Sequence, residues 1–303
     1  MESPGAIVPK SRKRQPKRVP LGPGKMPVRP LSKTVLEPDG RQRTVAYRPG
    51  RLKVDTEQAV FLATKVPPDF AVTYLPLVLL VDHLRGRNAN VCVDACLLLK
   101  RIYALLDIDA RITPMSVTVE PPGGGMSVYG QNPRWEEKVF AGHCVLWLPA
   151  MQRLVDPTVQ QFPELSHEDG PFVGRVGAAS QALPGELPVG ADIPIPRDGV
   201  QILYTVVGTE DLILDTEQAR HAEQLNPKSP ANLAGWALSI MATPSIAPRI
   251  RTAPFPRIHA LIDAIDGAEV DAGPAGYRFL LPGPDGQPTP TWVDDITLPA
   301  TAQ

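Results

Sequence analysis

The chain has 303 residues, enough for one sizeable domain or for one domain with a smaller appended unit. Hydrophobic residues make up 43% and aromatic residues only 6%, so we expect a mostly aliphatic core, and three cysteines are too few for a disulfide scaffold. The formal net charge of -1 hides an uneven distribution, because residues 1–55 carry a balance of +10 and the remainder carries -11.

The first 50 residues contain nine prolines, a basic cluster at residues 10–18 and little apolar periodicity. We predict that residues 1–50 form a disordered basic arm. Such an arm is either a solvated tail or a contact for nucleic acid, an anionic surface or the body of the protein. The start of the sequence shows no apolar stretch typical of a secretory signal.

Ordered structure is expected from about Leu52, with a first helix over residues 69–85. The most apolar run, Leu75 to Val81, lies in this helix and is too short to span a bilayer. We therefore expect a soluble, cytoplasmic protein without a membrane span.

A second helix is predicted over residues 91–106, because apolar side chains recur there at steps of three and four residues. Asn88 and Asn90 precede it as turn and capping residues. With Asn90 as the N-cap, Cys92 lies in the first turn of the helix.

Strands are predicted next, at residues 111–119 and 139–148, separated by a long loop at 121–138. The second of these strands is apolar on both alternations, which is typical of a central strand covered on both faces. After a short turn at 149–152, residues 153–159 form its partner strand.

The rest of the chain is predicted to be loop-rich at 163–198 and to form a strand at 200–208. Two helices follow at 230–242 and 255–266, and then a possible strand pair. The pair comprises Gly276–Leu281 and Thr291–Ile296. We divide the ordered part into a domain at residues 51–215 and a C-terminal extension at residues 216–303, which packs on it.

Cys92 is a candidate nucleophile because of its place in the predicted helix. The free N–H groups and dipole of a helix N-terminus favour a thiolate over a thiol. Cys96 lies one turn deeper on the same face, so we assign it to the core.

A thiol nucleophile also needs an imidazole and a group that orients the imidazole. His143 and Asp156 lie on the two strands of the predicted hairpin. If Leu148 pairs with Arg153 across the turn, His143 and Asp156 become diagonal neighbours on one face, at about 7 Å between Cβ atoms. This register predicts a hydrogen bond between them, which a slip of one residue would abolish.

The sequence around these residues resembles the transglutaminase-like family of thiol enzymes. The resemblance rests on Cys-Val-Asp-Ala-Cys from Cys92, on the leucine-rich stretch that ends in Asp-Ala-Arg at Arg111, on Gly-His at His143 and on Val-Asp-Pro-Thr around Asp156. It covers residues 65–165 and keeps the family order Cys, His, Asp. The chain departs from the pattern where Asp107 replaces a glycine and where Cys144 and Val145 follow the histidine.

The resemblance implies an α+β fold in which the cysteine helix packs on an antiparallel sheet. It also implies a Cys92–His143–Asp156 triad that carries out acyl transfer through an S-acyl intermediate: peptide or amide hydrolysis, deamidation, or transfer to an amine. The oxyanion hole would use the Cys92 backbone N–H and one more donor, for which Asn88 and Asn90 are the candidates.

Two other interpretations compete with this one. A zinc site could use Cys92, Cys96, His143 and Cys144, but adjacent strand residues point to opposite faces, so we expect no metal and no cofactor. Alternatively, the domain is a catalytically silent transglutaminase-like module that binds a protein or nucleic acid through its basic arm. The expected partners of the enzyme are a protein, a peptide or a small amide.

Overall fold

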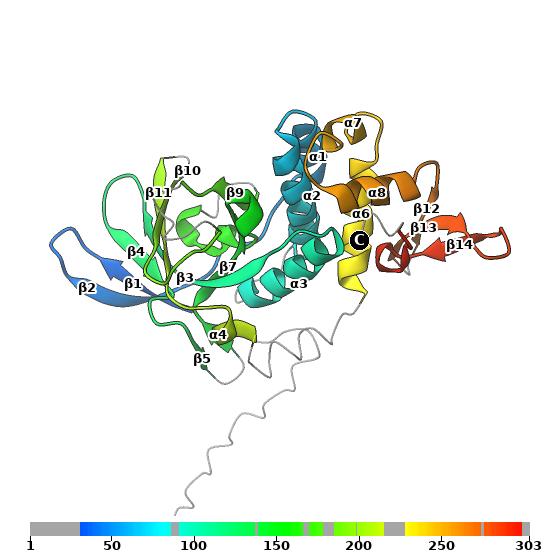
Figure 1. Ribbon diagram of the computed structural model, residues 1–303. Helices are drawn as coiled ribbons and strands as arrows, with labels where there is room; N and C mark the ends of the chain where they lie inside the picture. Colours follow the sequence, from blue (N-terminus) through cyan, green and yellow to red (C-terminus); the bar gives the residue numbers. More distant parts are fainter. Residues whose placement is uncertain are drawn as a thin grey trace, which may run out of the picture.

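The computed structural model describes residues 31–85, 91–136, 139–165, 170–177, 185–197, 199–214, 228–273 and 276–298. These residues form a mixed α+β structure in which antiparallel sheets pack with helices (Figure 1). The predicted α+β class is therefore confirmed. Within the described ranges, no helix is both long and apolar enough to cross a membrane.

The main sheet has nine strands, in the order β2-β1-β4-β3-β7-β8-β9. It branches at β3, because β3 also pairs with β11, which in turn pairs with β10. All of these pairings are antiparallel. The strands are β1 (Leu31–Leu36), β2 (Gln42–Tyr47), β3 (Arg111–Glu120), β4 (Met126–Tyr129), β7 (His143–Leu148), β8 (Arg153–Asp156), β9 (Phe172–Arg175), β10 (Asp192–Arg197) and β11 (Val200–Val206).

Helices cover one side of this sheet, and a smaller sheet lies beyond them (Figure 1). The described helices are α1 (Thr56–Ala63), α2 (Pro68–His83), α3 (Cys92–Leu105), α4 (Asp211–Leu214), α6 (Ser229–Met241), α7 (Ala247–Ile250) and α8 (Pro256–Ala264). The smaller sheets are β12-β13-β14, from Glu269–Gly273, Gly276–Pro282 and Pro288–Thr291, and the pair of β5 (Arg134–Glu136) with β6 (Val139–Ala141). Side chains of α2, α3 and α6 share one apolar core, so helices from both sides of residue 215 pack together.

Strand β7 separates two cores because its side chains alternate between the faces of the sheet. Cys144, Leu146 and Leu148 belong to the core that includes the helices. Val145 and Trp147 belong to a second core, which β10 and β11 close. All six residues of β7 are buried, which confirms the prediction of a central strand covered on both faces.

The predicted helices at 69–85, 91–106, 230–242 and 255–266 correspond to α2, α3, α6 and α8 within a few residues. The strands predicted at 111–119 and 200–208 are β3 and β11. The predicted strand at 153–159 ends earlier, at Asp156, and a 3-10 turn follows at Val159–Gln161.

The predicted boundary of the arm at residue 50 is wrong. Residues 31–47 form the β1–β2 hairpin, and β1 also pairs with β4, with Thr34 opposite Val128. Most β2 side chains are exposed, so their sequence lacks the apolar alternation on which the prediction relied. The basic cluster at residues 10–18 lies outside the described residues, and its disorder and contacts stay predictions.

The two predicted loops are also partly wrong. Residues 121–138 contain β4 and β5, and residues 163–198 contain β9 and β10. Strand β10 tolerates Pro194 and Pro196 because it pairs only with β11 and leaves its other edge free of ladder bonds among the described residues. The last strand, β14, ends at Thr291, where the prediction began it, and β12 was not predicted.

Helix α3 ends in a left-handed residue at the position where the resemblance led us to expect glycine. Asp107 has φ 59°, and the backbone N–H groups of Asp107 and Ile108 donate to the carbonyls of Ala104 and Tyr103. This pair of hydrogen bonds is typical of the Schellman motif, in which the left-handed residue is usually glycine. The strained φ of Asp107 therefore lowers the stability of the helix end.

Replacing Asp107 by glycine should raise the free energy of unfolding by about 0.5–1 kcal/mol, because relief of the left-handed strain exceeds the added chain entropy. Urea unfolding followed by circular dichroism measures this difference. The matched variant Asp107→Val should lower the stability, since a β-branched side chain tolerates this φ least. Equal stabilities of the two variants would contradict the assigned strain.

Candidate active site

The β7–β8 hairpin brings His143 and Asp156 together. Leu148 pairs with Arg153 and Leu146 with Val155, which is the register that the sequence predicted. A single 3-10 turn at Pro149–Met151 connects the strands. His143 Nε2 lies 2.8 Å from Asp156 Oδ2, so the predicted hydrogen bond is present.

Four donors surround the buried carboxylate of Asp156. Besides His143, the Tyr204 hydroxyl donates to Oδ2 at 2.8 Å. The backbone N–H of Thr158 donates to Oδ1 at 2.8 Å, and the Thr158 hydroxyl donates to the same oxygen at 3.3 Å. Asp156 is fully buried, and a buried carboxylate is tolerated only when such donors replace water.

Two members of this arrangement were missed at the sequence level. Tyr204 comes from β11, which reaches the site only because β11 pairs with β3. Gln161 comes from the 3-10 turn after β8, and its Nε2 lies 2.8 Å from His143 Nδ1. Tyr204 alternates with other inward-facing residues of β11, which was the only signal of its position.

Cys92 is the first residue of α3, so it lies at the helix N-terminus as predicted, but Val91 is the N-cap and not the predicted Asn90. Its side chain is buried in the same apolar core as Cys144. The neighbouring Cys144 side chain and burial raise the pKa of Cys92 well above its usual value, whereas His143 lowers it. The lowered pKa expected from the helix N-terminus is therefore not found in this arrangement, because Cys144 and burial outweigh the favourable groups.

For His143, the neighbouring groups outweigh the effect of burial on its pKa. Burial lowers its pKa, but the Asp156 carboxylate and then the Cys92 side chain raise it, and the result is about 10. The Asp156 carboxylate therefore makes the imidazole of His143 a stronger base than an ordinary histidine.

A glycine fixes the backbone of His143. Gly130 follows β4 with φ 67°, and a Cβ there would lie 2.9 Å from the backbone nitrogen of His143 and 3.0 Å from the carbonyl oxygen of Met115. No other residue type fits this close approach without moving β3 or β7. The ring of Phe162 packs edge-on against the imidazole at 5.1 Å between centroids.

The segment between β2 and α1, residues 48–55, bonds to the turn that carries Gln161; we call it the strap. It runs from the sheet to the helices (Figure 1). Gly50 N–H donates to the Gln161 carbonyl at 3.0 Å, and Lys53 N–H donates to Gln160 Oε1 at 2.6 Å. Leu52 is only 2% exposed and belongs to the same apolar core as Cys92.

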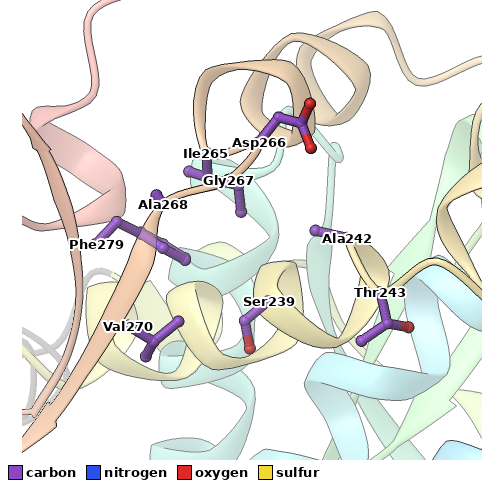
Figure 2. A pocket seen from close by; sticks show the side chains of 9 residues that line it. All are labelled: Ser239, Ala242, Thr243, Ile265, Asp266, Gly267, Ala268, Val270 and Phe279. Atoms are coloured by element: carbon purple, nitrogen blue, oxygen red, sulfur yellow. The ribbon is translucent and has the colours of Figure 1, made fainter.

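An open hollow lies elsewhere, between α6, the end of α8 and the β12–β13 strands (Figure 2). Its volume is about 180 Å³, below the range of roughly 300–1,000 Å³ that is typical of ligand pockets. The residues that line it are Ser239, Ala242, Thr243, Ile265, Asp266, Gly267, Ala268, Val270 and Phe279. None of the candidate triad belongs to it.

The described residues contain no group of three or more His, Cys, Asp or Glu side chains placed to hold a metal ion. His143 lies against the second core, next to Phe162, whereas Cys144 belongs to the core that includes the helices. Asn88 and Asn90 lie outside the described residues, so their oxyanion role stays a prediction.

Comparisons with protein-family models, with curated proteins and with solved structures find no match to this chain. The resemblance to transglutaminase-like enzymes therefore rests on the quoted residues alone. The functional argument has to come from the geometry of the site.

We predict that Leu52→Ala speeds the alkylation of Cys92 by iodoacetamide, because Leu52 anchors the strap. The matched control is Leu106→Ala. Leu106 is another buried leucine of the same core and lies about 20 Å from Cys92, at the other end of α3. Each truncation should cost about 2–5 kcal/mol of stability. At equal loss of stability, we expect at least tenfold faster alkylation in Leu52→Ala, measured by mass spectrometry of the Cys92 peptide.

Equal acceleration in both variants would mean that Cys92 becomes accessible only through global unfolding. The strap would then not be the element that opens the site.

Proposed function

We propose that this chain is a cysteine-dependent acyl-transfer enzyme of the transglutaminase-like kind, acting as a peptide or amide hydrolase, a deamidase or a transferase to amines. The observation that carries the proposal is the 2.8 Å bond between His143 and Asp156, together with Cys92 at the N-terminus of α3, which is close enough to the imidazole to raise its pKa. A nucleophile, a base and an orienting carboxylate are the three parts of such a site.

The first half-reaction starts from neutral His143, whose Nε2–H donates to Asp156. The Cys92 proton can pass only to Nδ1, because the Asp156 bond uses Nε2. The Cys92 sulfur then attacks the amide carbonyl carbon, and the imidazolium returns a proton to the leaving nitrogen as the C–N bond breaks. The product is a thioester on Cys92 and a free amine or ammonia.

The second half-reaction releases the acyl group. Water or an amine gives a proton to His143 Nδ1 and attacks the thioester carbonyl, and the thiolate of Cys92 leaves and regains the proton. The backbone N–H of Cys92 lies in the first turn of α3, where N–H groups have no partner within the helix, so it can stabilise the oxyanion.

The closed arrangement is a resting state in this proposal. Opening of the strap would admit solvent and substrate and thereby relieve the burial that raises the pKa of Cys92. The substrate class is a protein, a peptide or a small amide, and a cytoplasmic location would keep the thiols reduced.

A second candidate function is the catalytically silent module that binds a protein or nucleic acid through residues 10–18. The raised pKa and the burial of Cys92 favour it, because a binding module has no need of an activated thiol. The two candidates differ in whether Cys92 forms a covalent acyl adduct.

We predict that p-nitrophenyl acetate acetylates Cys92, with release of p-nitrophenol, and that Cys96 and Cys144 stay unmodified. His143→Ala should slow this acylation about 10²–10⁴-fold, the usual contribution of a general base. Stopped-flow absorbance gives the rate, and peptide mass spectrometry gives the site.

Cys92→Ala is the control for nonspecific hydrolysis and should remove the burst of p-nitrophenol. Acetylation of Cys92 that is no faster than that of Cys96, and that is insensitive to His143→Ala, would reject the enzyme and favour the silent module.

A further inference from the structure

Gln161 holds the side of the imidazole opposite Asp156. Its Nε2 lies 2.8 Å from His143 Nδ1 and 3.2 Å from Thr158 Oγ1, and the residue is only 7% exposed. Its backbone carbonyl accepts from Gly50 of the strap, so the turn that carries it is held from both sides. His143 thus lies between a carboxylate and a carboxamide.

The charge of His143 decides which ring nitrogens carry a hydrogen at these contacts. The Asp156 carboxylate can only accept, so Nε2 carries a hydrogen in both states. In the neutral imidazole Nδ1 is an acceptor, and the Gln161 amide can donate to it, as it is placed here. In the imidazolium Nδ1 carries a hydrogen as well, and the same contact would set two donors against each other.

A carboxamide resolves this conflict by rotation about its last side-chain bond, which exchanges Nε2 and Oε1. Oε1 can then accept from Nδ1–H. The Thr158 hydroxyl, which accepts from Gln161 Nε2 and donates to Asp156 Oδ1, would turn its one hydrogen to Oε1, and the backbone N–H of Thr158 would remain as the donor to Asp156 Oδ1. A carboxylate, a thioether or an alkyl side chain at position 161 could satisfy at most one of the two states.

We propose that Gln161 is a positioning residue that follows the proton of His143, donating to Nδ1 when the imidazole is neutral and accepting from Nδ1–H when it is charged. Its significance for catalysis rests on the proposed function, in which Nδ1 takes and returns the Cys92 proton. Gln161 then competes with Cys92 for Nδ1 of the neutral imidazole, and it stabilises the imidazolium.

Other groups also act on this imidazole and have to stay unchanged in a test. Asp156 from β8 is the anion paired with it, and the neighbouring Cys92 from α3 also raises its pKa. Tyr204 from β11 lies with its ring centroid 6.4 Å from that of the imidazole. A substitution at position 161 leaves all three side chains in place.

The test is a titration of the ¹⁵N-labelled imidazole of His143 by NMR, with its signals assigned by their loss in His143→Ala. Gln161→Met removes the carboxamide and keeps a side chain of similar length. Because hydrogen bonds to charged groups are stronger than those to neutral ones, we expect the pKa of His143 to fall by about one unit, about tenfold in the protonation equilibrium. Gln161→Glu should shift it in the opposite direction, since a carboxylate only accepts.

The matched control is Gln160→Met, which removes the neighbouring buried carboxamide whose Oε1 accepts from Lys53 N–H. It should leave the titration of His143 close to that of the wild type. An unchanged pKa in folded Gln161→Met, or the same shift in Gln160→Met, would overturn the proposal.

This experiment uses no substrate, so its failure differs from the failure of the proposed function. Acetylation of Cys92 with an unchanged His143 titration in Gln161→Met would keep the enzyme and reject the role of Gln161. A shifted titration without acetylation would keep the role of Gln161 in setting the imidazole and reject the enzyme.

Discussion

The structure of the site depends on the burial of a hydrogen-bonded pair, His143 and Asp156, where the two cores of the described residues meet. A carboxylate without water needs several donors, and His143, Tyr204 and Thr158 supply two to each oxygen, from two strands and a turn. Loss of both donors to one oxygen would leave it buried without a partner, which costs about 1–3 kcal/mol or more for a charged group. The pair therefore constrains three separate segments of the chain to one arrangement.

The surrounding fold meets this constraint with small and apolar residues. Gly130 allows β4 to approach the backbone of His143, and Phe162 packs on the ring. The strap bonds to the turn that carries Gln161. The burial that surrounds the His143–Asp156 pair also raises the pKa of Cys92, so burial of the site and reactivity of the thiol oppose one another.

The sequence predicted the local parts of this site better than its long-range parts. The apolar alternation and the short turn at 149–152 were enough to predict the register of β7 and β8, and with it the His143–Asp156 bond. Helix periodicity placed Cys92 at an N-terminus, which α3 confirms. These inferences needed only neighbours within one helix or one hairpin.

The remaining features depend on which strands pair across long stretches of sequence. Tyr204 reaches Asp156 through the pairing of β11 with β3, and the strap reaches the turn that carries Gln161 because residues 31–47 join the sheet. Strand β2 is mostly exposed and carries no clear apolar alternation, so the sequence suggested disorder there. In β10 two isoleucines do alternate inward, but the prolines between and after them suggested a loop. The raised pKa of Cys92 likewise follows from burial and from Cys144, which the local helix could not reveal.

The pH dependence of Cys92 alkylation by iodoacetamide, in chains that carry Cys96→Ala and Cys144→Ala, tests the central claim most directly. The experiment compares two proteins in this background, one with His143 intact and one with His143→Ala. We expect the removal of His143 to raise the apparent pKa of Cys92 and to slow its alkylation at neutral pH, because the imidazole that stabilises the thiolate is lost. Superimposable pH profiles of the two proteins would contradict a coupled thiol–imidazole pair and leave Cys92 as a buried residue of the core.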